Sequence, residues 1–142
     1  MTKMFFVNLP VADLERSMAF YSALGFTNEP KFTDETAACM VWSEAIYVML
    51  LTHDKWATFT DRPITSDGSS NLRLCISLDS REDVETMNDA AGANGGTADV
   101  DPATDYGFMM SRAFADPDGH AWEPMWMAPK AAQEGQPAQI AE

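Results

Sequence analysis

The side chains best suited to catalysis lie close together near the C-terminal end of the sequence, around the segment Asp-Pro-Asp-Gly. Asp116, Asp118, His120 and Glu123 supply carboxylates and an imidazole, and such groups serve in general acid–base catalysis and metal binding. A β-turn accounts for Asp116 and Asp118 equally well, because Asp-Pro-Asp-Gly is typical of tight turns. His120 then fits the end of the hairpin that this turn connects. Glu123 is the carboxylate that a turn does not explain.

Signatures of nucleophilic catalysis are not found in the sequence. Neither His53 nor His120 lies in a nucleophile context of the Ser-His-Asp or Cys-His kind. There is also no glycine-rich phosphate loop. Cys39 and Cys75 each lie in an apolar segment, so we interpret them as buried free thiols in a reducing compartment.

Length, composition and charge restrict the classes of partner. The 142 residues fit one domain, and 46% apolar with 22% charged residues is ordinary for a globular protein. The net charge of −13 disfavours nucleic acid and anionic membrane surfaces. No apolar run reaches the ~20 residues of a membrane span, and the N-terminus turns polar too early for a signal peptide. We therefore expect a cytoplasmic protein with no nucleic-acid or membrane partner.

The order strand, helix, three strands is predicted twice along the chain. In the first set Asp13 is a typical helix N-cap and Gly25 a typical helix stop. The predicted strands and helices of this set cover 4–11, 13–24, 27–33, 36–42 and 45–52. The second set covers 71–79, a helix from Ser80 to Asn94, and strands over 97–100, 107–115 and 120–127. Such a duplication indicates two structural repeats.

These repeats define the expected domain organisation. We predict a single domain over residues 1–127, followed by a flexible C-terminal tail over 128–142. Within the domain, module one covers about 3–52 and module two about 71–127, joined by a polar connector over 53–70.

Two stretches go beyond generic pattern. The first, Asn8-Leu9-Pro10-Val11-Ala12-Asp13-Leu14-Glu15-Arg16-Ser17, continues to Phe20-Tyr21 and Leu24-Gly25-Phe26. The second is Phe114-Ala115-Asp116-Pro117-Asp118-Gly119-His120-Ala121-Trp122-Glu123. They resemble the opening strand and helix, and the closing hairpin, of the vicinal oxygen chelate superfamily of glyoxalases, bleomycin resistance proteins and extradiol dioxygenases. The resemblance covers about residues 3–127.

The resemblance implies an α+β fold. In this family two tandem βαβββ modules form a strongly curved, cup-like mixed sheet, the glyoxalase-like fold, whose concave side encloses a site. Most members are homodimers in which modules of two chains complete each cup, although some pair the modules within one chain. Some members chelate vicinal oxygens of the substrate through a divalent metal, whereas others have lost the metal and bind small molecules such as drugs.

Only one of the four metal-ligand positions of the family carries a ligand in this sequence. The matching positions are Phe6, Leu50, Arg73 and Glu123. A catalytic metal needs about three protein ligands, so no metal or other cofactor is expected. Arg73 and Glu123 could instead form a bidentate ion pair at that place. An atypical divalent metal site remains the alternative, with Asn8, Thr52, Cys75 and Ser77 as candidate polar residues and His53 nearby.

Three functions follow for this site. The leading prediction is binding of a small, partly apolar organic molecule in a metal-free cup by a protein that we expect to be a homodimer, with Glu123 as the candidate catalytic residue if a reaction occurs. The ligand-binding residues would be Phe6, Asn8, Leu50, Arg73, Cys75, Ser77 and Met125. One alternative is a divalent-metal-dependent lyase, isomerase or dioxygenase with an atypical ligand set, in which Glu123 is a ligand or the base. The other is a non-catalytic interaction module.

Overall fold

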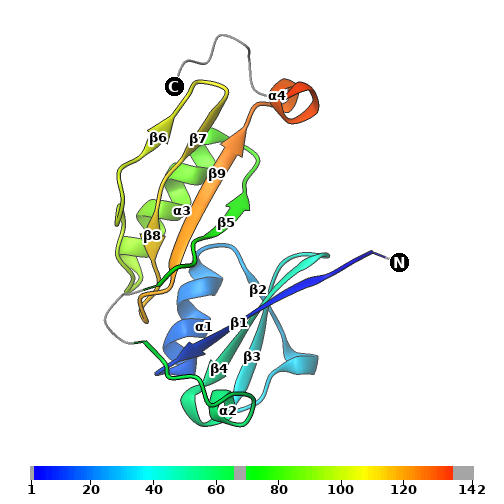
Figure 1. Ribbon diagram of the computed structural model, residues 1–142, viewed down its shortest axis with the longest axis vertical. Coiled ribbons are helices and arrows are strands. Elements are labelled where there is room, and N and C mark those ends of the chain that lie inside the picture. Colours follow the sequence, from blue (N-terminus) through cyan, green and yellow to red (C-terminus); the bar gives the residue numbers. More distant parts are fainter. Residues whose placement is uncertain (1, 66–69, 136–142) are drawn as a thin grey trace.

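Two modules stack along the long axis of the molecule (Figure 1). The computed structural model describes residues 2–65 and 70–135. Each module has its own mixed sheet, and no described strand of one sheet pairs with a strand of the other. The predicted α+β fold with tandem βαβββ modules is confirmed, with the strands divided between two sheets.

Module one follows the predicted order of strand, helix and three strands. Its elements are β1 (Phe5–Val11), α1 (Leu14–Ala23), β2 (Thr27–Glu29), the short 3-10 helix η1 (Pro30–Phe32), β3 (Ala37–Ser43) and β4 (Ile46–Thr52). The sheet order is β1-β4-β3-β2, with β1 parallel to β4 and the other pairs antiparallel. The strand β1 is therefore an edge strand.

Local signals explain where the elements of module one begin and end. The Asp13 side chain accepts a hydrogen bond from the backbone N–H of Arg16 at 3.1 Å and caps α1. After α1 the chain reverses at Gly25, whose φ of 109° is one that a residue with a side chain rarely adopts. The strand predicted over 27–33 is shorter than expected, because Pro30 lacks a backbone N–H and begins η1.

Module two repeats the order with more irregular strands. Its elements are β5 (Leu74–Ser77), α3 (Arg81–Ala93), β6 (Thr104–Asp105), β7 (Met109–Ser111), β8 (Phe114–Ala115) and β9 (Ala121–Met127). The sheet order is β5-β9-β7-β6, and β8 also pairs with β9. The strand predicted over 97–100 is wrong, because Asp99 has a φ of 55° that no extended strand allows. Only an isolated bridge from Thr97 to Ala115 is found there.

Two short helices lie where the sequence predicted none. The connector begins with α2 (His53–Ala57), which the Thr52 side chain caps by accepting from the Lys55 backbone N–H at 3.2 Å. The predicted flexible tail begins with α4 (Pro129–Glu134), and Ala131 on this helix is buried. The part of the predicted tail over 136–142, and connector residues 66–69, lie outside the described residues. None of the described helices is long and apolar enough to cross a membrane.

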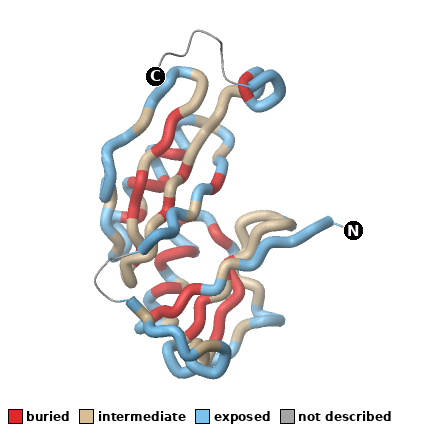
Figure 2. The backbone as a smooth tube through the Cα atoms, in the orientation of Figure 1, coloured by how far each residue is buried: buried red, intermediate tan, exposed pale blue. Residues whose placement is uncertain are grey.

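One hydrophobic core spans both modules. Buried segments run through the strands and the inner sides of α1 and α3 (Figure 2). The core cluster joins residues of module one, such as Tyr21 and Leu50, to residues of module two, such as Met87 and Phe114. Trp122 on β9 is 1% exposed, and its ring lies 5.9 Å from that of Tyr21 and 5.8 Å from that of Phe26. The modules are therefore packed against each other through aromatic side chains.

Alternation along the strands gives each sheet two different faces. One face packs against the helices and is buried. We call the opposite face of each sheet the cup face. The candidate site is built on the cup faces of the two sheets.

Candidate functional site

The cup face of module two carries most of the residues predicted for the site. In the parallel pairing of β5 with β9, Cys75 lies beside Glu123 and Ser77 beside Met125. Their neighbours Ile76 and Trp122 point to the core and are buried, so the alternation places these four side chains on the open face. Arg73 lies directly before β5 and reaches the same place.

Arg73 and Glu123 form an ion pair on this face. The Arg73 Nη2 atom lies 3.3 Å from Glu123 Oε1, and Arg73 Nε lies 3.9 Å from Asp101 Oδ2. The Arg73 side chain is 50% exposed and that of Glu123 22% exposed. The pairing predicted from the sequence is found, but through a single guanidinium nitrogen and not in the bidentate form. Donors of the guanidinium therefore stay available to another acceptor.

The thiol of Cys75 is set between these two charges. Burial raises the pKa of the Cys75 thiol, Glu123 raises it further, and Arg73 lowers it. The thiol is therefore protonated at neutral pH and is a poor nucleophile. Both cysteines are free, as predicted. Cys39 is buried, but Cys75 is exposed because it lies on the open face of β5, so the prediction that both thiols are buried is wrong for Cys75.

The cup face of module one is more apolar. The Phe6 ring stacks on the Tyr47 ring, with centroids 4.6 Å apart and an interplanar angle of 13°. Asn8 follows on the same face of β1 and is exposed. The prediction that Leu50 lines the cup is wrong: it is fully buried in the core, and its neighbours Met49 and Leu51 occupy the cup face of β4.

The two cup faces belong to different halves of the molecule. Figure 1 shows β1 and β4 in one half and β5 and β9 in the other. Phe6 and Asn8 are therefore not brought beside Arg73 and Glu123 by any strand pairing within the described chain. A single chain therefore presents its two cup faces separately.

The donor set of the cup faces does not fit a divalent metal. At the positions that match the metal ligands of the family, Phe6 and the core residue Leu50 have no lone pair to offer, and Arg73 holds a cation. Within residues 2–65 and 70–135, no group of three His, Cys, Asp or Glu side chains is placed to hold a metal ion. The alternative set is also dispersed, because Thr52 caps α2 while Cys75 and Ser77 lie on β5.

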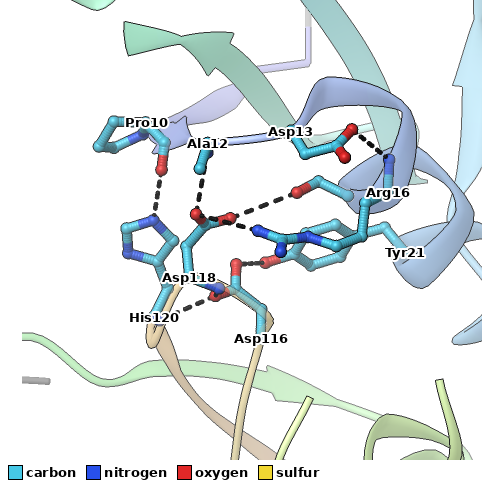
Figure 3. Close-up of polar contacts among 9 residues, drawn as sticks. Pro10, Ala12, Asp13, Arg16, Tyr21, Asp116, Asp118 and His120 are labelled. Atoms are coloured by element: carbon cyan, nitrogen blue, oxygen red, sulfur yellow. Dashed lines mark hydrogen bonds and ion pairs between the residues drawn. The ribbon is translucent and has the colours of Figure 1, made fainter. Parts of the chain in front are cut away.

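The acidic residues of the closing turn join the two modules (Figure 3). Asp118 accepts hydrogen bonds from the Ala12 backbone N–H at 2.9 Å and from Ser17 Oγ at 3.3 Å, and it pairs with Arg16 Nη2 at 3.4 Å. His120 Nε2 lies 2.8 Å from the Pro10 carbonyl oxygen. We call these contacts, with those of Asp116 and its partners Tyr21 and Trp122, the module clamp.

Asp116 is the buried centre of the clamp. Tyr21 donates its hydroxyl hydrogen to Asp116 Oδ2 at 2.6 Å, and Trp122 Nε1 donates to the Tyr21 hydroxyl oxygen at 3.0 Å. The backbone N–H groups of Asp118 and His120 donate to Asp116 Oδ1. Burial raises the pKa of Asp116, while the charge of His120 and the Tyr21 hydrogen bond lower it. Burial, and then Asp116, raise the pKa of Tyr21 well above its ordinary value.

The clamp explains the group of carboxylates that first suggested catalysis. Asp116 and Asp118 form the predicted turn. Module one occupies both oxygens of Asp118 and Oδ2 of Asp116, while backbone N–H groups of the turn itself occupy Asp116 Oδ1. No sequence signal marks this long-range role directly, although the participating residues of module one lie within the first recognisable motif and those of module two within the second. Of the four acidic and imidazole side chains near the C-terminal end, Glu123 alone lies on a cup face.

Paired βαβββ modules with a cup face on each sheet define the class of protein, and comparison with known proteins agrees. The family model of the Glyoxalase/Bleomycin resistance protein/Dioxygenase superfamily matches residues 3–123. The chain therefore belongs to this superfamily. Among curated proteins, no sequence matches it.

Solved structures of low sequence identity share the fold. A hypothetical protein, SA1046 from S. aureus, is 21% identical with a TM-score of 0.73, over 89% of this chain and 94% of that chain. A glyoxalase/bleomycin resistance protein/dioxygenase family enzyme from Burkholderia phytofirmans PsJN is 16% identical with a TM-score of 0.72, over 89% and 99%. The fosfomycin resistance protein FosX from Mesorhizobium loti is 14% identical with a TM-score of 0.66, over 94% and 98%.

Proposed function

We propose that the protein binds a small, partly apolar organic molecule between cup faces, without a metal ion. The observation that carries this proposal is the half-exposed Arg73–Glu123 pair on the cup face of β5 and β9, next to Cys75, Ser77 and Met125. An exposed ion pair of this kind stabilises a fold by only about 0–1 kcal/mol. Its guanidinium is better suited to binding a polar group of a ligand, while Met125 and the stacked Phe6 supply apolar contact.

Two variants test the role of the pair. We expect a thermal-shift screen of aromatic carboxylic acids and their amides to find compounds that raise the Tm of the parent. Arg73→Gln with Glu123→Gln should remove that response and leave the Tm without compound nearly unchanged, because the pair is exposed. Asp89→Asn on the exposed side of α3 serves as the control and should keep the response. Compounds that stabilise the double variant as much as the parent would refute a ligand site at Arg73 and Glu123.

Elemental analysis tests the metal-free part of the proposal. Protein purified without chelators is expected to contain no stoichiometric divalent metal, and added Zn²⁺, Mn²⁺, Ni²⁺ or Mg²⁺ should not change its Tm, because the cup faces lack a ligand set. The alternative, a metal-dependent enzyme, predicts stoichiometric metal in the parent, its loss in Glu123→Ala and its retention in Asp89→Ala. That result would make Glu123 a ligand.

We further propose that a second copy of the chain completes each cup. Phe5 and Phe6 on the edge strand β1, and Met4 directly before it, are exposed, and Phe5 is 63% exposed. Exposed apolar residues beside an unpaired strand edge favour association. Because the two cup faces lie in separate halves of one chain, a module of a second copy would supply the face that each of them lacks.

The mass of the protein in solution tests the dimer. We expect light scattering coupled to gel filtration to give the mass of two chains for the parent and of one chain for Phe5→Glu, because a buried unpaired carboxylate would disfavour the interface. Phe32→Glu, at an equally exposed aromatic residue of η1, should remain dimeric. A monomeric parent would contradict the proposal.

A further inference from the structure

A cleft of about 570 Å³ opens between the two modules, at the end of the molecule's shared core. Its walls come from the turn after α1 and the end of β3 in module one, and from the end of β5 and one face of α3 in module two. It shares Ser77 with the cup face, but its aromatic and acidic residues do not belong to the cup face. This volume falls within the range of ~300–1,000 Å³ typical of small-molecule sites.

Apolar side chains of the core lie at the base of the cleft. Leu24 and Met87 line it and are also part of the core cluster. The half-buried Trp42 ring forms a wall, with its centroid 5.0 Å from that of the Phe26 ring. A Cβ atom placed on Gly25 would lie only 3.6 Å from Trp42, so the turn also packs close to this ring. The wall is an aromatic surface fixed by its neighbours.

The rim of the cleft is acidic. Asp79 and Asp83 line it, and both residues are exposed. None of the cleft-lining residues is basic. Within the described part of the chain, the carboxylates of these two residues make no ion pair and accept no hydrogen bond. The arginines that form ion pairs there do so with other acids; they are Arg16, Arg73, Arg81 and Arg112. The cleft therefore combines an aromatic wall with negative charge that no protein cation neutralises.

We propose that this cleft binds an organic amine with an aromatic or alkyl body. A protonated amine would approach Asp79 and Asp83 while its apolar part contacts Trp42, Leu24 and Met87. Carboxylates attract the cation, and the face of an indole ring attracts it as well. A hard metal ion suits the cleft less, because two carboxylates supply too few of the six to eight oxygen ligands that calcium takes. The site adjoins the cup face at Ser77 but does not depend on the function proposed for the cup.

Calorimetry with 2-phenylethylamine as the probe tests the class of ligand. We expect the protonated amine to bind the parent, and to bind more weakly as salt is added, because the carboxylates are exposed to screening. The anion 3-phenylpropanoate and the neutral 2-phenylethanol carry the same ring and should bind about tenfold more weakly or not at all.

Charge-removing variants locate the site. Asp79→Asn with Asp83→Asn keeps the size of both side chains and should weaken amine binding about tenfold. Glu82→Gln with Asp89→Asn changes the net charge by the same amount on α3, outside the cleft, and should leave the affinity within about twofold. Thr86→Trp, at an exposed lining position, should block the cleft without changing its charge.

The outcomes separate cleanly once circular dichroism shows that each variant is folded. Amine binding that is lost in the Asp79/Asp83 variant and in Thr86→Trp, but kept in the Glu82/Asp89 variant, supports the proposal. No binding to the parent, equal binding of the anion, or equal loss in both double variants would overturn it. A shift of the Trp42 indole resonance on adding amine, identified by its absence in Trp42→Phe, would place the ligand at the aromatic wall.

Discussion

Replacing Tyr21 by Phe is expected to lower the free energy of unfolding by about 2–4 kcal/mol, because it leaves two buried polar groups without partners. The Tyr21 hydroxyl is the acceptor for Trp122 Nε1 and the donor to Asp116 Oδ2. Both partners belong to module two, so the substitution weakens the connection between the modules. Equilibrium unfolding in urea, followed by circular dichroism, measures the loss.

Tyr47→Phe is the matched control for this prediction. The same atom is removed, but the Tyr47 hydroxyl donates to the Glu44 carbonyl oxygen in an exposed turn. Water can replace that partner, so the loss should be below about 1 kcal/mol. If the two variants lose the same stability, the clamp contributes nothing beyond an ordinary surface hydrogen bond.

The Tyr21→Phe effect should depend on pH through Asp116. Burial raises the pKa of Asp116 in the folded protein, so its protonated form favours folding, and this contribution is lost as pH rises through the folded pKa. Removing the Tyr21 hydrogen bond removes an influence that lowers this pKa, which moves it higher still. The stability difference between parent and variant is therefore expected to shrink as pH falls through the Asp116 pKa.

Trp122→Ala is expected to have the largest effect, a loss of about 3–5 kcal/mol, because it empties the centre of the aromatic cluster. Trp122 is fully buried between the Tyr21, Phe26 and Phe114 rings. A loss of this size is a large part of the ~5–15 kcal/mol stability of a typical domain. The midpoint of urea unfolding should therefore fall steeply.

Trp126→Ala on the same strand provides the comparison. Trp126 is half-buried, and the Arg81 guanidinium lies 5.5 Å from its ring, so a loss of about 1 kcal/mol is expected. Trp122→Phe keeps a ring in the cluster and should fall between these values, which guards against a Trp122→Ala variant that does not fold. Equal losses in Trp122→Ala and Trp126→Ala would contradict the central place of Trp122.

The order of the elements could be predicted because their boundaries are set locally. Asp13 and Ser80 cap helices through contacts three residues away, and Gly25 reverses the chain by its own backbone conformation. Such signals are read directly from sequence. The helices α2 and α4 were missed because helices of five or six residues carry little periodicity, and tertiary contacts such as that of Ala131 decide whether they form.

The face of a strand was harder to predict where all its residues are apolar. The run Ile-Tyr-Val-Met-Leu-Leu in β4 shows no polar alternation, and an error of one residue exchanges the two faces. The family resemblance placed Leu50 at the cup, and the apolar strand pattern offered no sign that it lies in the core. In β5 the polar residues Cys75 and Ser77 alternate with Leu74 and Ile76, and there the predicted cup face agrees with the structure.

The clamp could not be predicted because it depends on which surfaces meet. A carboxylate in a tight turn satisfies the sequence pattern whether or not it contacts another module. What distinguishes Asp116 is its burial against Tyr21, which arises only when α1 and β9 pack together. The Arg73–Glu123 contact could be predicted because the family resemblance placed both residues at the same site.

The module clamp also determines when the fold can be completed during synthesis of the chain. The strand β1 and the helix α1 leave the ribosome first, but the Ala12 amide and the Pro10 carbonyl find their partners 106 and 110 residues later in the chain. Contacts between such distant residues form slowly. The first module therefore emerges with an unfinished face, and arrival of the last hairpin completes both halves at once.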